Sequence, residues 1–149
     1  MRRALGVAAV ALAAVGAGCS GSDGELARRI AAEVAKGAGT VVRLAEVAEF
    51  SWDKLHIFDP YSSRDLIESR LGFEWPQADH TGIRDSDGVT LLVFVKSGGV
   101  VRYVTQPRNQ GDFAGLSQPA GFSPAEAVFT VTPRGDGAFL LVPVQEASK

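Results

Sequence analysis

The segment Val89–Lys96 constrains the fold more than any other part of this chain of 149 residues. Its apolar residues occupy both alternating sets of positions, with Val89, Leu91, Val93 and Val95 in one set and Leu92 and Phe94 in the other. Successive side chains of a β-strand point to opposite faces of the sheet, so both faces of this strand must be buried. The sequence therefore predicts a central strand that other elements cover on both sides.

Two hairpins are expected in the second half of the chain. Ser97-Gly98-Gly99 predicts a tight turn into a strand over 100–105. A last hairpin is expected from strands over 128–132 and 138–144, joined by the turn 134–137. Strands that are joined by such short turns pair in antiparallel fashion.

The region 40–58 is expected to be extended with a break. Phe50 and Trp52 occupy even positions, whereas Leu55 and Ile57 occupy odd ones. A regular strand cannot keep all four side chains on one face, so a bulge or break is predicted near Asp53.

Two helices are predicted from capping patterns. Ser22 with Glu25 favours a helix over 25–36, where apolar residues recur every four positions and form one stripe. Ser62 with Asp65 favours a short helix that ends near residue 71, before Gly72.

Together these elements predict an α+β fold: one small domain over 25–149 with a largely antiparallel sheet of about four to five strands and two short helices. The segment 106–127 has no strand pattern and is long for a connection in a compact domain. Loops of this length are usually functional or mobile, so this segment is a candidate binding region.

The first nineteen residues have the pattern of a secretory signal peptide. Arg2 and Arg3 precede an apolar run over 4–15, and small residues then lead to the only cysteine, Cys19. The apolar run is shorter than the ~20 residues that a membrane-spanning helix needs. We therefore expect residues 1–18 to be removed.

A lone cysteine after small residues resembles a bacterial lipoprotein signal. Gly18 and Ser20 fit that pattern on either side of Cys19, while Gly16 stands where the family usually has Leu. The resemblance implies cleavage between Gly18 and Cys19 and a diacylglycerol group on the Cys19 sulfur. The Ser, Gly and Asp residues that follow predict a short tether, so the lipidated cysteine and its tether are expected over 19–24. The alternatives are plain secretion and an uncleaved anchor.

Charge excludes one class of partner. Of the 15 basic residues, Arg2 and Arg3 belong to the signal, so 13 remain against 17 acidic ones. A mildly acidic chain lacks the basic patch that nucleic acid requires. Contact with a membrane would then depend on the lipid at Cys19.

The segment Phe50–Phe58, followed by Pro60 and Tyr61, resembles a pattern in small bacterial secreted proteins and lipoproteins of unknown activity. The resemblance implies an envelope-associated α+β domain and brings no cofactor or catalytic residue with it. Four aromatic residues are candidates for contact with a partner: Trp52, Tyr61, Phe113 and Phe122. For Trp52 and Tyr61 the sequence favours a structural role, since aromatic side chains bury much apolar area, and partner contact is the alternative.

The sequence contains few patterns that indicate catalysis or metal binding. His56 and His80 are the only histidines and have no metal-ligand spacing, so neither a metal nor a cofactor is predicted. The sequence favours a lipoprotein anchored in the cell membrane or outer membrane, whose extracytoplasmic domain binds an envelope protein, peptide or glycan without catalysis. The alternative is a small extracytoplasmic enzyme that acts on cell-wall or extracellular substrate through one histidine and a nearby carboxylate.

Overall fold

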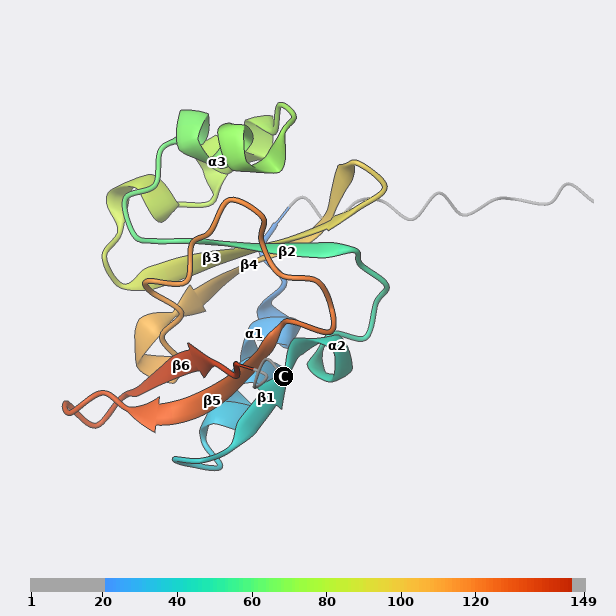
Figure 1. Ribbon diagram of the computed structural model, residues 1–149. Helices are drawn as coiled ribbons and strands as arrows, with labels where there is room; N and C mark the ends of the chain where they lie inside the picture. The colour runs from blue at the N-terminus through green and yellow to red at the C-terminus, as the bar shows by residue number, and fades with distance from the viewer. Residues whose placement is uncertain (1–20, 146–149) are drawn as a thin grey trace, which may run out of the picture.

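The computed structural model describes residues 21–145, so the predicted signal peptide and Cys19 lie outside the described residues. Within this range six strands form two antiparallel sheets of three strands each (Figure 1). The central sheet has the order β2-β3-β4, with β2 at Lys54–Phe58, β3 at Val89–Lys96 and β4 at Gly99–Pro107. The second sheet has the order β1-β5-β6, with β1 at Val41–Arg43, β5 at Val128–Pro133 and β6 at Phe139–Pro143. The predicted α+β class is confirmed, and the strands divide between two sheets.

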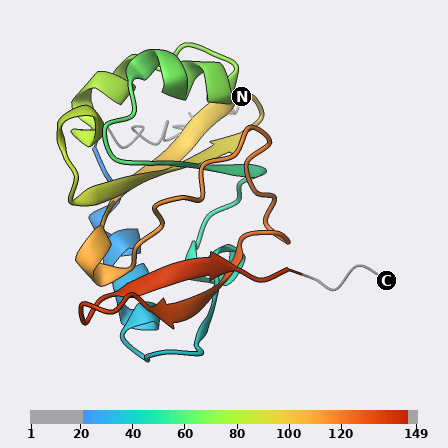
Figure 2. The same cartoon turned by 60° about the vertical axis from the view of Figure 1, so that its left-hand side comes forward.

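The central position of β3 is confirmed. The helix α3 (Arg64–Leu71) and two 3-10 helices, η1 (Pro76–His80) and η2 (Ile83–Asp85), cover one face of the central sheet through a small apolar cluster. The helix α1 (Gly24–Val34) and the second sheet cover the other face through the larger core. Figure 2 shows these layers, with α3 above the central sheet and the second sheet below it.

Helix α1 buries the predicted stripe of Leu26, Ile30 and Val34. Its N-cap is Asp23, whose side chain accepts a hydrogen bond of 3.0 Å from the Leu26 N–H. The predicted cap, Ser22, is wrong by one residue because its hydroxyl instead accepts the Thr105 N–H at 2.8 Å.

The same shift by one residue occurs at α3. Ser63 caps this helix by accepting the Leu66 N–H, whereas the predicted cap, Ser62, donates its hydroxyl to the Asp59 carbonyl at 2.7 Å. The helix ends at Gly72 as predicted, with a left-handed φ of 82°.

The region 40–58 is less extended than predicted. A helical turn, α2 (Leu44–Val47), separates β1 from β2 and buries Leu44 as the chain crosses between the sheets. The predicted break near Asp53 is confirmed, because β2 begins only at Lys54. Asp53 supports this break by accepting the Ser97 N–H at 2.9 Å, in the hairpin between β3 and β4.

The segment 106–127 connects the two sheets. Its first residues continue β4 and form a 3-10 helix, η3 (Arg108–Gln110). The main chain of Asp112 then pairs with β6, and the main chain of Phe122 exchanges two hydrogen bonds of 2.8 Å with Leu55 of β2. The segment is therefore fixed to an edge of each sheet, in contrast to a loop that stands away from the domain.

Candidate functional site

Three of the four aromatic residues predicted for partner contact belong to the core. Trp52, Phe113 and Phe122 are at most 6% exposed. Trp52 packs edge-to-face on Phe94 with ring centroids 5.2 Å apart. Their burial leaves little surface for a partner to contact and fits the structural role weighed for Trp52, although Phe122 still lines a hollow with Pro143.

Tyr61 is the exception among these four, since 61% of it is exposed. It adopts a left-handed φ of 67° in the turn before α3. Its N–H donates to the Ile83 carbonyl at 2.8 Å, which ties this turn to η2. Gly18 and Cys19, the predicted processing site, lie outside the described residues.

Among residues 21–145 neither histidine makes a hydrogen bond or ion pair with a carboxylate. His56 is buried and stacks on Phe58, and no hydrogen bond to its Nδ1 occurs among residues 21–145. Burial, followed by the charges of Lys54 and Arg70, lowers the pKa of His56. His80 is exposed, and the neighbouring Asp79 carboxylate is bound by Arg64 at 2.9 Å.

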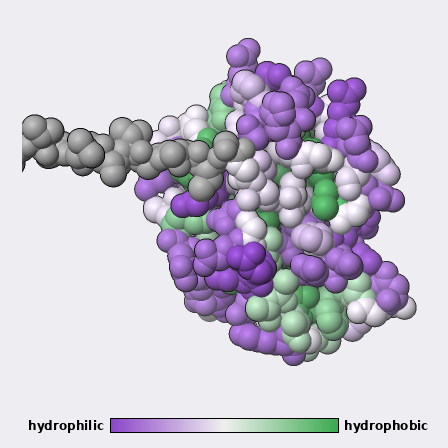
Figure 3. All heavy atoms as spheres, turned by 180° about the vertical axis from the view of Figure 1, so that it is seen from behind, coloured by the Kyte–Doolittle hydropathy of each residue, from purple (hydrophilic) through white to green (hydrophobic). Residues whose placement is uncertain are grey.

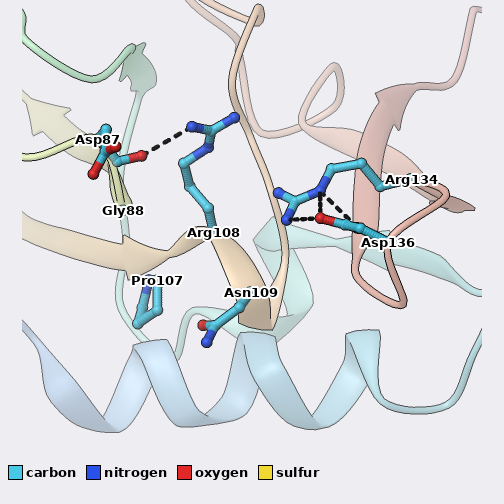
Figure 4. A pocket seen from close by; sticks show the side chains of 7 residues that line it. All are labelled: Asp87, Gly88, Pro107, Arg108, Asn109, Arg134 and Asp136. Atoms are coloured by element: carbon cyan, nitrogen blue, oxygen red, sulfur yellow. Dashed lines mark hydrogen bonds and ion pairs between the residues drawn. The ribbon is translucent and has the colours of Figure 1, made fainter.

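A polar cleft lies where the start of β3, the end of β4 and the β5–β6 turn meet (Figure 4). Its volume is about 670 Å³. The residues that line it are Asp87, Gly88, Pro107, Arg108, Asn109, Arg134 and Asp136. We call it the arginine cleft, because Arg108 and Arg134 both line it. Figure 4 shows their side chains on opposite sides of one segment of the chain.

A buried carboxylate holds the two arginines in place. Asp112 is 1% exposed, and Arg108 binds it with two hydrogen bonds of 3.0 and 3.1 Å. Arg134 Nη1 donates to the same carboxylate at 2.6 Å, and the Ala114 N–H donates at 2.9 Å. Because two-point pairing of a guanidinium with a carboxylate fixes its orientation, Asp112 presets the geometry of the cleft.

These contacts keep the carboxylates of the site charged. Burial acts to raise the pKa of Asp112, but the hydrogen bonds from Arg108, the Ala114 N–H and Arg134 outweigh it, so the pKa lies below its usual value. The side-chain hydrogen bond from Arg134 lowers the pKa of Asp136 to about 2. At neutral pH the lining of the cleft therefore carries both positive and negative groups.

Each arginine retains hydrogen-bonding capacity. A guanidinium has five N–H donors. In the contacts among residues 21–145, Arg108 uses one donor on each nitrogen, two for Asp112 and one for the Asp87 carbonyl. Arg134 likewise uses one on each nitrogen, for Asp112 and Asp136. Each guanidinium therefore keeps two N–H groups that these contacts do not use.

An apolar groove adjoins the arginine cleft. It has a volume of about 350 Å³ and is lined by Ala31, Val34, Ala35, Asn109, Gln110, Gly137 and Phe139. Asn109 lines both hollows, so they are neighbours. Figure 3 shows an apolar area on the lower part of the face viewed from behind. The combined surface can receive a polar group and an apolar group side by side.

The chemistry that this surface offers is hydrogen bonding from guanidinium groups. Guanidinium donors match the planar geometry of carboxylates and bind phosphate as well. Among residues 21–145 no group of three or more histidine, cysteine or acidic side chains is arranged to hold a metal ion. In the same range no helix has the length and apolar character needed to cross a membrane.

Sequence reasoning located only part of this site. The segment 106–127, which contains Arg108 and Asp112, was expected as a binding region because of its length, but neither residue was singled out, and the turn 134–137 was expected only as a connection. One local signal existed: Arg108 and Asp112 are four residues apart, a spacing at which opposite charges can pair in a helical turn. The contribution of Arg134 depends on tertiary structure and leaves no local signal.

A scan against protein-family models and searches of curated proteins and of solved structures returned no match to this chain.

Proposed function

We propose that this protein is an exported, lipid-anchored binding module of the bacterial envelope. Its ligand carries a carboxylate next to an apolar group, as does a peptide that ends in an apolar residue. The arginine cleft takes the carboxylate and the apolar groove takes the neighbouring group.

One observation carries the binding proposal: the buried Asp112 carboxylate holds two arginines from distant parts of the sequence beside one open cleft. Preset donors lose little conformational freedom when a ligand binds, which favours recognition. Asp87 and Asp136 lie in the lining beside the two arginines, and the buried Asp112 adds a third carboxylate, so the site has no excess of positive charge. Selectivity is therefore expected from the placement of donors, with little long-range attraction.

The anchor proposal rests on the sequence. The basic start, the apolar run and the lone Cys19 form a lipoprotein-type signal. The lipid would keep the module at the membrane, because each buried methylene of an acyl chain contributes ~0.8 kcal/mol. Cell fractionation checks this part: the wild-type protein should sediment with membranes, and Cys19→Ala should not.

A pair of small probes tests the binding part. N-acetyl-leucine has a carboxylate beside an apolar side chain, and N-acetyl-leucinamide replaces that carboxylate by a neutral amide. In NMR titrations the acid should shift the amide signals of Asn109 and Gly137, which line the site. The amide should bind at least about tenfold more weakly, since a hydrogen bond to a charged group contributes ~1.5–3 kcal/mol.

Matched arginine variants complete this test. Arg134→Gln removes donors from the cleft and should abolish the preference for the acid. Arg28→Gln removes the same charge from an exposed position on α1 outside both hollows and should retain the preference. Equal binding of the two probes, or an equal effect of the two variants, would contradict the proposed site.

A further inference from the structure

The first described residues are attached to the exposed edge of the central sheet. β4 is an edge strand of that sheet, paired with β3 on one side. On its other side the Asp23 N–H donates to the Tyr103 carbonyl at 2.9 Å, and the Thr105 N–H donates to the Ser22 hydroxyl at 2.8 Å. Residues 22 and 23 thus occupy part of the hydrogen-bonding edge that β4 would otherwise expose.

Side chains strengthen this attachment. The hydroxyls of Ser22 and Thr105 lie 3.1 Å apart, and the Asp23 carboxylate caps α1 while lying 3.9 Å from Arg102. A segment with these contacts belongs to the folded domain. The tether expected over 19–24 is therefore shorter than predicted, because it ends at Ser22.

This attachment limits how far the domain can lie from a lipid on Cys19. The three residues from Cys19 to Ser22 can span at most about 11 Å when fully extended. We infer that the outer edge of β4 is held at the bilayer surface, with the opposite edge of the central sheet directed away from it. This inference rests on the proposed lipid anchor. It specifies in addition which face of the domain meets the membrane.

Charge does not supply an alternative orientation. Side chains around this end of the domain include Glu25, Arg29, Glu49 and Arg102, which have both signs. Such a mixed surface gives neither strong attraction to anionic lipid nor strong repulsion from it. The covalent link and the hydrogen bonds of residues 22 and 23 therefore determine which face meets the lipid.

Two residues at opposite edges of the central sheet are suitable for attaching a fluorescent dye. Val101 is a partly exposed residue of β4, and Ala120 is an exposed residue beside Phe122, which pairs outside β2. Three strand spacings of about 4.8 Å separate β4 from the Phe122 segment, or about 14 Å in total. The inference predicts that Val101 lies closer to the membrane than Ala120 by a comparable distance.

Energy transfer to labelled lipid measures this difference in the full-length, lipidated protein. Val101→Cys and Ala120→Cys each introduce one thiol for a donor dye, since Cys19 is the only natural cysteine. The proposed lipid would occupy the Cys19 sulfur. The vesicles contain phosphatidylcholine and a small fraction of lipid with an acceptor dye on its headgroup. Transfer from position 101 should exceed transfer from position 120 by about twofold or more, because the edges differ in height by about 14 Å.

A linker variant and flotation complete the experiment. Twelve Gly and Ser residues inserted between Ser20 and Gly21 should reduce the transfer from position 101 and remove the difference between the two positions. Protein that floats with the vesicles but shows equal transfer at both positions would overturn the inferred orientation alone. Protein that fails to float would overturn the anchor, and with it the proposed function.

Discussion

Asp112 is the residue on which the geometry of the arginine cleft depends. Its main chain pairs with β6 while its side chain binds Arg108 and Arg134, so one residue joins the end of β4 to the β5–β6 turn. A charge that is removed from water becomes stabilising only when its partners satisfy it. Here four hydrogen bonds to the carboxylate meet that condition.

Replacing this carboxylate should destabilise the fold. Asp112→Asn should lower the free energy of unfolding at pH 7 by about 2–3 kcal/mol, because two guanidinium groups lose a charged acceptor. Urea unfolding followed by tryptophan fluorescence measures this. The control is Asp136→Asn, which removes a largely exposed partner of Arg134 and should cost much less.

The effect of Asp112 should also depend on pH. Its pKa is lowered in the fold, so its stabilisation is present above the pKa of an unfolded aspartate, about 3.9, and is lost as the pH falls through the folded value. Wild type and Asp112→Asn should therefore converge in stability in acid. A constant difference between them down to pH 2 would contradict this account.

His56 should give the protein a second pH dependence. Because burial lowers its pKa below 6.5, the unfolded chain binds a proton before the folded one does as the pH falls. Stability is thus complete above pH 6.5 and decreases below it. Urea unfolding at pH 7.5, 6.5 and 5.5 should show this loss in wild type and less of it in His56→Gln, while His80→Gln should behave like wild type.

At the scale of elements, the segment 106–127 holds the two sheets together. Phe113 and Phe122 both contact Phe129 edge-to-face, with ring centroids 5.5 and 5.4 Å apart. Close packing at Gly121 fixes the approach: a Cβ there would lie 2.6 Å from the Leu55 carbonyl oxygen, and φ is +62°. The segment packs as part of the core.

Truncation of one aromatic residue tests this role. Phe122→Ala should lower the free energy of unfolding by about 3–4 kcal/mol, as expected for a large buried side chain. Tyr61→Ala removes the exposed aromatic residue of the same sequence-based set and should change stability by less than about 0.5 kcal/mol. A small effect of Phe122→Ala in thermal or urea unfolding would show that the segment is not part of the core.

The helix starts show what local sequence can determine. A serine–acid pattern located both helices within a residue or two, because caps and stops are chosen by local hydrogen bonding. It did not select between Ser22 and Asp23, or between Ser62 and Ser63. At α1 a tertiary partner made that choice, since the Thr105 N–H binds the Ser22 hydroxyl. At α3 the choice is local, since the Ser62 hydroxyl donates to the carbonyl of Asp59, three residues earlier in the chain.

At the scale of the molecule, the pattern of apolar and polar residues along each strand predicted much of the architecture. The apolar character of both sides of β3 was enough to place it centrally, and the turn at Ser97 and Gly98 has the two positive φ values that a tight hairpin needs. Pairing between distant segments was not predictable in this way. Asp112 meets Leu140, and Phe122 meets Leu55, through the folded arrangement alone.

The arginine cleft was unpredictable for the same reason. Arg108 and Arg134 are exposed types of residue in unrelated segments, and only the fold brings both to Asp112. The prediction of a lipid anchor, in contrast, rests on contiguous residues, because a signal peptide is a local sequence pattern, and it stays a prediction. The proposed function joins these two parts: a domain with a preset cleft, held at a membrane by its first mature residue.

Intact-mass analysis of the protein purified from bacterial membranes tests that account most directly. For wild type we predict a chain that begins at Cys19 and carries the added mass of a diacylglycerol group. Cys19→Ala should lack that increment. An unmodified product in both proteins would contradict the lipid anchor and therefore the central claim.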